Sequence, residues 1–176
     1  MKILVHICCA PCFAYPHKKM REEEHEVIGY WYNPNIHPYM EYKARKDALI
    51  KYSKIENVEI IYGEYDFKDY LKQIKNFERP DRCINCYEYR LNKTAEYAKN
   101  NSFDAFSTTL LSSHNQYHNE IKRVGEKIGE KYGIKFYYKD FREGAGEARA
   151  IIKVYGLYTQ KYCGCLISEW ERFKED

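Results

Sequence analysis

The chain has 176 residues, which is long enough for one domain with a sizeable hydrophobic core. Hydrophobic residues make up 44% of it and charged residues 31%, and no apolar run is long enough to cross a bilayer. The net charge of +3 is mildly basic and does not by itself indicate nucleic-acid binding. The N-terminal apolar run is too short for a signal peptide, so we expect a cytoplasmic protein with no membrane partner.

The first half of the chain alternates predicted strands with predicted helices. Residues 2–9 read as a buried strand, and Pro11 suits the first turn of a helix that runs to about residue 25. The alternation continues with a strand at 26–34, a helix at about 38–55, a strand at 58–62 and a helix at 66–77.

The second half keeps the same alternation and predicts the fold class. It comprises a helix at 79–100, a strand at 104–113, a helix at 115–133, a strand at 134–141, a helix at 146–156 and a tail helix at 166–174. About five strands alternating with helices predict an α/β fold with a doubly wound parallel sheet. We find no linker, so we expect one domain over residues 1–176. Ligands of such sheets gather at the carboxyl ends of the strands.

Seven cysteines form the strongest chemical signal in the chain. Their number is odd and the chain lacks secretory features, which argues against a disulfide framework and favours metal binding or redox chemistry. They fall into three tight groups, which are Cys8, Cys9 and Cys12, then Cys83 and Cys86, then Cys163 and Cys165.

The spacing within each group limits how the thiols share metal centres. Adjacent residues on an extended backbone point to opposite sides, so Cys8 and Cys9 are not expected to bind one ion together. Cys83 and Cys86 lie one helical turn apart and can share a face. An iron–sulfur cluster or a structural zinc site takes four thiolates, which leaves up to three for a second metal.

A catalytic second metal would take a carboxylate ligand and keep one position open for substrate. Asp81 is our first candidate for this carboxylate, because it lies two residues before Cys83. Its alternative role is the N-cap of the helix that follows. Asp140, at the end of the fifth predicted strand, is the second candidate. Neither a P-loop nor a GxGxxG motif follows the first strand, so a nucleotide phosphate site is not expected there.

Five motifs together resemble the QueH-type epoxyqueuosine reductases. They are HICCAPC at 6–12, RCINCYEYRL at 82–91, FSTTLL at 106–111, KDF at 139–141 and YTQKYCGC at 158–165. The resemblance covers nearly the whole chain and matches all seven cysteines, without saying which cysteine serves which centre. It implies a fold similar to the adenine nucleotide alpha-hydrolases without their phosphate loop. It also implies a [4Fe-4S] cluster and a second, mononuclear metal, for which we expect iron.

The same resemblance implies a reaction and its partners. The expected activity is cobalamin-independent reductive removal of the epoxide oxygen of epoxyqueuosine in a tRNA anticodon, giving queuosine and using an external electron donor. We expect Arg90, Arg142 and Arg149 to contact the tRNA, and Tyr158 to offer a stacking surface for a base. Arg90 is the best candidate, since it follows Cys83 by two helical turns.

Two other classes of function also fit the cysteines. A zinc-stabilised RNA-binding module would use two of the groups for one tetrahedral site and carry out no catalysis. A thiol–disulfide oxidoreductase would use Cys9 and Cys12, but it leaves the other two groups without a role. A sulfur-transferring tRNA enzyme is disfavoured, because it would need ATP and the phosphate loop is absent.

Overall fold

A five-stranded, entirely parallel sheet forms the centre of the molecule in a computed structural model that describes residues 1–74 and 76–175. The strand order is β3-β2-β1-β4-β5. The strands are β1 (Lys2–His6), β2 (Glu26–Trp31), β3 (Ile60–Tyr62), β4 (Ala105–Thr108) and β5 (Lys135–Phe136). The predicted α/β class with a parallel sheet is therefore confirmed.

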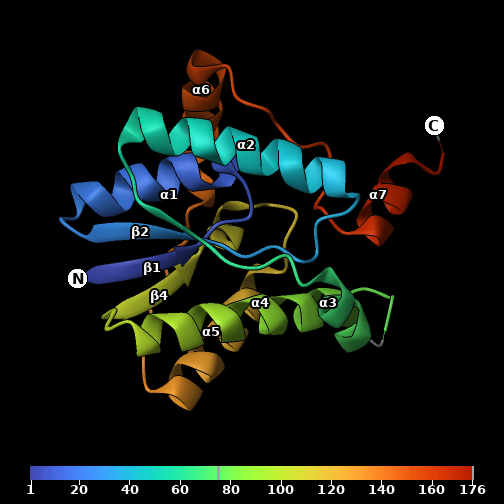
Figure 1. Cartoon of the computed structure of the whole chain (residues 1–176), viewed down its shortest axis with the longest axis horizontal. Helices are drawn as coiled ribbons and strands as arrows, with labels where there is room; N and C mark the ends of the chain where they lie inside the picture. Colours follow the sequence, from blue (N-terminus) through green and yellow to red (C-terminus); the bar gives the residue numbers. More distant parts are fainter. Residues whose placement is uncertain (75, 176) are drawn as a thin grey trace.

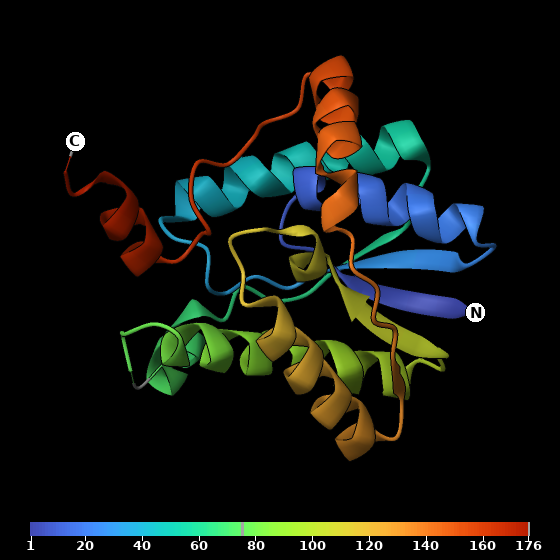
Figure 2. The same ribbon diagram turned by 180° about the vertical axis from the view of Figure 1, so that it is seen from behind.

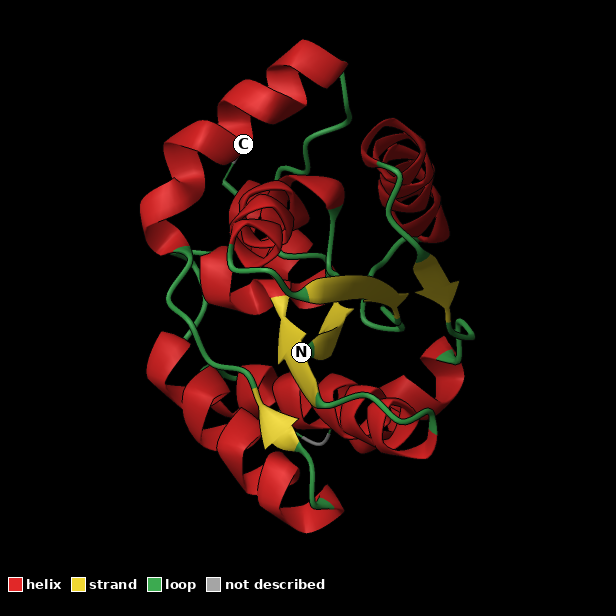
Figure 3. Ribbon diagram, turned by 90° about the vertical axis from the view of Figure 1, so that its left-hand side faces the viewer, coloured by secondary structure: helices red, strands yellow, loops and turns green. Residues whose placement is uncertain are grey.

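Helices cover both faces of this sheet (Figure 1), and Figure 3 shows the same layering with the sheet seen end on. The helices α1, α2 and α6 lie on one face and α3, α4 and α5 on the other. Their bounds are α1 (Ala10–Glu22), α2 (Tyr39–Glu56), α3 (Phe67–Gln73), α4 (Asp81–Asn100), α5 (His118–Tyr132), α6 (Ala145–Tyr155) and α7 (Leu166–Phe173). Two short 3-10 helices are η1 (Thr109–Ser112) and η2 (Arg142–Gly144).

The core is built around β1, which pairs with β2 on one side and β4 on the other. Its residues Ile3, Leu4 and Val5 have no solvent exposure, as expected for a central strand covered on both faces. Within the described residues, no helix has the length and apolar character needed to span a bilayer.

All five strands are shorter than the sequence predicts, and β1 and β4 end where the next helix or turn begins. β1 stops at His6 rather than at Cys9, because Cys9 is the N-cap of α1. β4 stops at Thr108, whose hydroxyl accepts a hydrogen bond from the Leu110 backbone and starts η1. β5 has two residues instead of the predicted 134–141. The residues released from the strands lie at the carboxyl edge of the sheet.

The end of one helix, α5, lies where the sequence predicts it. α5 ends at Gly133 in the left-handed conformation, with φ of 61°, as predicted. α4 begins at Asp81 itself, after Pro80, and no side chain caps it. The N-cap role predicted for Asp81 is therefore wrong, because this residue already belongs to the first turn.

The segment between α6 and α7 brings the last two cysteines back to the sheet. Figure 2 shows it running alongside α2 toward the end of the molecule where α7 lies. Arg45 of α2 holds it there, since its guanidinium nitrogens Nη1 and Nη2 donate to the carbonyl oxygens of Cys163 (2.9 Å) and Tyr162 (3.0 Å). A buried charge with several hydrogen bonds fixes a segment firmly, and here it fixes the YCGC motif.

Candidate metal centre

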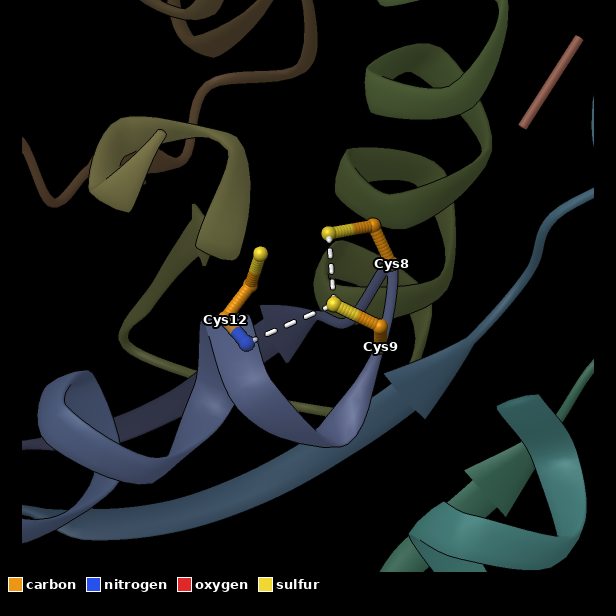
Figure 4. A group of neighbouring side chains, drawn as sticks. All are labelled: Cys8, Cys9 and Cys12. Carbon is orange, nitrogen blue, oxygen red and sulfur yellow. Dashed lines mark hydrogen bonds between the residues drawn. The ribbon is translucent and has the colours of Figure 1, made fainter. Parts of the chain in front are cut away.

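The first cysteine group forms a compact cluster of three thiols at the carboxyl end of β1. The sulfurs of Cys8, Cys9 and Cys12 all lie within 4.8 Å of one another. Figure 4 shows the three side chains directed toward one another, with Cys9 and Cys12 at the start of α1. Three thiols at this separation can bind a single metal ion.

The expectation that Cys8 and Cys9 are poorly placed to bind one ion together is wrong. Their sulfur atoms are 3.8 Å apart. The alternation of side chains applies only within a strand, and β1 ends two residues before Cys8. Cys9 takes the N-cap position instead, where its sulfur accepts a hydrogen bond from the backbone nitrogen of Cys12 at 3.4 Å.

Hydrogen bonds favour the thiolate form of Cys8 within this cluster. The neighbouring thiols of Cys12 and Cys9, together with the Thr109 hydroxyl at 3.2 Å, hold the pKa of Cys8 well below its ordinary value against the opposing effect of burial. Burial raises the pKa of Cys9. The anionic Cys8 raises that of Cys12. Metal binding requires thiolates, so Cys8 is the thiol best prepared to bind first.

A neutral histidine lies behind the cluster. Burial, together with the nearby Arg90 charge, lowers the pKa of His6 to about 3, so the ring is uncharged at neutral pH. Its Nε2 lies 3.1 Å from the Tyr32 carbonyl, which can only accept, so Nε2 carries the proton. Nδ1 then accepts from the Thr108 hydroxyl at 3.0 Å. His6 is thus fixed by two bonds and joins β1, β2 and β4 at their carboxyl ends.

The second and third cysteine groups meet in one small cavity. Cys83, Cys86, Cys163 and Cys165 all line a space of about 100 Å³. Most of the remaining wall is apolar and includes Ile74 and Ile167. Four thiols around a dry pocket are the donor set of a cubane cluster or a structural zinc ion.

Burial favours the protonated form of two of these thiols, Cys83 and Cys163, in the metal-free chain. It raises the pKa of Cys83 to about 11 and also raises that of Cys163. Binding a metal there must therefore displace protons, which makes loading dependent on pH.

Arg90 supplies the positive charge that such a group needs. Its side chain is buried, lines the small cavity and has one guanidinium nitrogen, Nη2, without a hydrogen-bond partner. A buried cation without a partner is strongly unfavourable unless an anionic group lies beside it. A thiolate-ligated cluster is anionic, so the residues fit it. Burial also means that Arg90 does not reach a tRNA phosphate at the surface, contrary to its expected role.

A larger cavity of about 720 Å³ adjoins both cysteine sets. Cys8 and Cys12 lie on its wall, and Cys163 and Gln116 line both the larger and the small cavity. The two candidate centres therefore share one wall. The volume falls within the usual range for small-molecule sites. Cations also line it, namely Arg45, Arg79, Lys161 and Arg172.

Two glutamines bind the cysteine sulfurs and were not identified from the sequence. Nε2 of Gln160 donates to Cys9 Sγ at 2.9 Å, and its Oε1 is buried without a partner. Nε2 of Gln116 donates to Cys163 Sγ at 3.2 Å. Gln160 belongs to the YTQKYCGC motif, so its position beside the cysteines was the available signal. Gln116 lies in no motif, and only the fold brings it to the site.

The two carboxylates expected at a metal lie elsewhere in the structure. Asp81 is exposed and accepts a hydrogen bond from the Asn76 side chain at 2.9 Å. Asp140 is paired with Arg142 at 2.5 Å, and this partner holds its pKa well below the ordinary value. Neither residue lines the cavities that contain the cysteines. Their roles as ligands stay predictions.

The three remaining substrate candidates lie around the site rather than in it. Arg142 is occupied by Asp140. Arg149 lines a pocket of about 180 Å³ that also contains Cys12. The Tyr158 hydroxyl donates to Glu41 at 2.5 Å, and the residue is 40% exposed. A half-exposed ring two residues before Gln160, which lines the larger cavity, remains compatible with base stacking.

Comparison with known proteins gives a consistent result over almost the full length. A family model described as epoxyqueuosine reductase QueH matches residues 3–171. A protein of that name from Dehalococcoides mccartyi is 39% identical over 173 residues, covering 98% of this chain and 94% of the relative. The Thermotoga maritima protein is 36% identical over 179 residues (97% and 91% coverage). The Histophilus somni protein is 34% identical over 174 residues (95% and 72% coverage).

Proposed function

The chain belongs to the epoxyqueuosine reductase QueH family, and from this premise we propose that it is an oxidoreductase of tRNA modification. Its reaction would be the removal of the epoxide oxygen from epoxyqueuosine in a tRNA anticodon, to give queuosine. The observation that carries the proposal is the division of the seven cysteines into sets of three and four on either side of a shared wall.

The two sets suit two different metal groups. Cys83, Cys86, Cys163 and Cys165 would hold a [4Fe-4S] cluster in the small cavity. Cys8, Cys9 and Cys12 would hold a second metal, iron in our proposal, beside the larger cavity. When bound, a low-potential cluster supplies electrons one at a time, and a metal with an open position polarises an oxygen ligand.

The larger cavity would receive the modified nucleoside. Arg79, Lys161 and Arg172 lie on its wall and would contact anticodon phosphates. The unpartnered Oε1 of Gln160 would accept a hydrogen bond from a substrate hydroxyl, while its Nε2 stays on Cys9. Arg149 and Tyr158 would extend this binding surface outside the cavity, and Arg142 stays a weaker candidate because Asp140 occupies it.

Conversion of an epoxide to an alkene and water consumes two electrons and two protons. The electrons come from an external donor.

The test is metal analysis of anaerobically purified protein followed by turnover with epoxyqueuosine-containing tRNA and a reductant. We expect iron and sulfide, with more iron than one cubane contains, and formation of queuosine. Cys9→Ala and Cys163→Ala should each abolish turnover. Ser53→Ala should not, because that hydroxyl donates to the Ile50 carbonyl of α2 and Ser53 lines neither cavity that contains the cysteines. Full activity in either cysteine variant would refute the metal roles. Colourless zinc protein that binds tRNA without turnover would establish the RNA-binding module instead.

A further inference from the structure

Two arginines are fully buried near the cysteines, and they differ in how their charge is balanced. Arg45 forms an ion pair with Glu41 at 2.6 Å and donates to two carbonyl oxygens. Arg90 donates one long bond from Nε to the Cys86 carbonyl oxygen, at 3.3 Å. In the part of the chain that the structure describes, no carboxylate lies within 4 Å of the Arg90 guanidinium.

The anionic groups that can balance Arg90 are cysteines of both sets. Cys86 and Cys163 interact with it electrostatically from the small cavity, and Cys8 does so from the three-thiol cluster. Its charge is also felt by His6, beside Cys8. Arg90 lies two turns after Cys83 on α4, its Nε bonds the Cys86 carbonyl, and its side chain lines the small cavity. It is thus placed between the two candidate metal sites.

We propose that Arg90 is a positioning residue that provides the shared counter-charge of both thiolate sites and raises the reduction potential of the group held by the four cysteines. This inference rests on the proposed iron–sulfur cofactor. Reduction adds a negative charge to the cluster, and a fixed cation in a dry pocket stabilises that charge more than it does in water. The unpartnered Nη2 is the atom available to face the bound group.

The experiment compares variants of the full chain after anaerobic reconstitution, using a redox titration followed by electron paramagnetic resonance. The comparison is made at the potential where the cluster of the unmodified protein is half reduced. At that potential we expect the ratio of reduced to oxidised cluster in Arg90→Met to be at least tenfold lower. For a one-electron couple this is a shift of about −59 mV or more. Arg90→Lys keeps the charge and should show a smaller shift. Lys127→Met removes an exposed charge from the outside of α5 and should leave the potential unchanged.

Iron and sulfide per chain are measured in the same samples. If Arg90→Met holds no cluster, retention of the cluster by Arg90→Lys supports the counter-charge, whereas equal loss in both variants overturns it. A normally loaded Arg90→Met protein with an unshifted potential overturns the inference and leaves the proposed function intact. An unmodified chain that binds no iron and sulfide would overturn both.

Discussion

The side-chain amide nitrogen of Gln116 lies 3.2 Å from the sulfur of Cys163 and donates a hydrogen bond to it. Both residues line the larger and the small cavity, so this contact forms part of the wall between the two candidate metal sites. The amide cannot rotate freely, because its oxygen accepts a hydrogen bond from the Tyr87 hydroxyl at 2.7 Å. A fixed donor at a cysteine sulfur is a recognised means of adjusting a metal centre.

Removing this donor should slow turnover without emptying the site. In Gln116→Leu we expect turnover per bound iron to fall about two- to tenfold, because a net hydrogen bond contributes about 0.5–1.5 kcal/mol. Tyr87→Phe should have a smaller effect in the same direction, since the amide remains but loses its orienting partner. Tyr132→Phe serves as the control, because Tyr132 is the last residue of α5 and lines neither cavity. Unchanged turnover in Gln116→Leu would show that the contact is incidental.

The two cysteine sets should lose different amounts of metal when disrupted. Cys86→Ser is expected to lose the sulfide and most of the iron, because all four thiolates of the small cavity are needed to hold a cluster. Cys12→Ser should retain the sulfide and lose only the smaller share of iron bound beside the larger cavity. Iron and sulfide assays of both variants give the comparison. Identical losses would mean that the sets form one centre.

Gly164 allows Cys163 and Cys165 to reach the same cavity. Its φ is +133°, a region that favours glycine, and a Cβ there would lie 3.1 Å from Ile36 and 3.2 Å from Arg45. We expect Gly164→Ala to lower the free energy of unfolding by about 1–3 kcal/mol and to reduce bound iron. The measurements are urea unfolding and iron content.

Gly146 provides a matched control for this substitution. It lies in α6, and an added Cβ meets no atom within 4 Å. Gly146→Ala should therefore leave iron content unchanged and raise the free energy of unfolding by up to about 1 kcal/mol. Equal iron loss in both variants would contradict the role assigned to the Gly164 conformation.

Acid should destabilise the fold through His17. This residue is buried against Phe13 and bonded to the Tyr52 hydroxyl at 2.9 Å. Burial and then the Arg21 charge lower the pKa of His17 from 6.5 to about 4. Between these values the unfolded chain binds a proton that the folded chain excludes, so stability is complete above pH 6.5 and falls as the pH drops toward 4.

The expected loss is about 2 kcal/mol in the free energy of unfolding on going from about pH 7.5 to about pH 5. Urea unfolding at constant ionic strength measures it. The His17→Gln variant has no group that titrates in this range at that position. Its loss in the free energy of unfolding should therefore be smaller by about 2 kcal/mol. Parallel pH profiles for the two proteins would rule out His17 as the source.

Binding of tRNA should depend on salt through the cations of the larger cavity. For Lys161→Ala and Arg172→Ala we expect weaker binding and a salt slope smaller by about one for each phosphate contact removed. Lys127→Ala should behave like the unmodified chain. Filter binding across a salt series provides the slopes, and slopes equal to that of the unmodified protein would place the RNA elsewhere.

Much of the fold is encoded locally and could be predicted. Alternating apolar segments and helical periods identified five parallel strands, and the end of α5 at Gly133 followed from the same kind of reasoning. Cysteine spacing indicated metal binding and placed Cys8 at the carboxyl edge of the sheet. Strand lengths were overestimated, because Cys9 and Thr108 begin turns through their own side-chain hydrogen bonds.

The sequence by itself determined the sheet, the helices and the chemical type of the donors, since each depends on residues close together along the chain. Only the tertiary structure decided which cysteines face one another, that Arg90 lies buried between them, and that Gln116 touches Cys163. These relationships depend on the direction of side chains from distant segments, held by contacts such as that of Arg45 with the Cys163 carbonyl. No local pattern specifies those directions, because packing of the whole core fixes them.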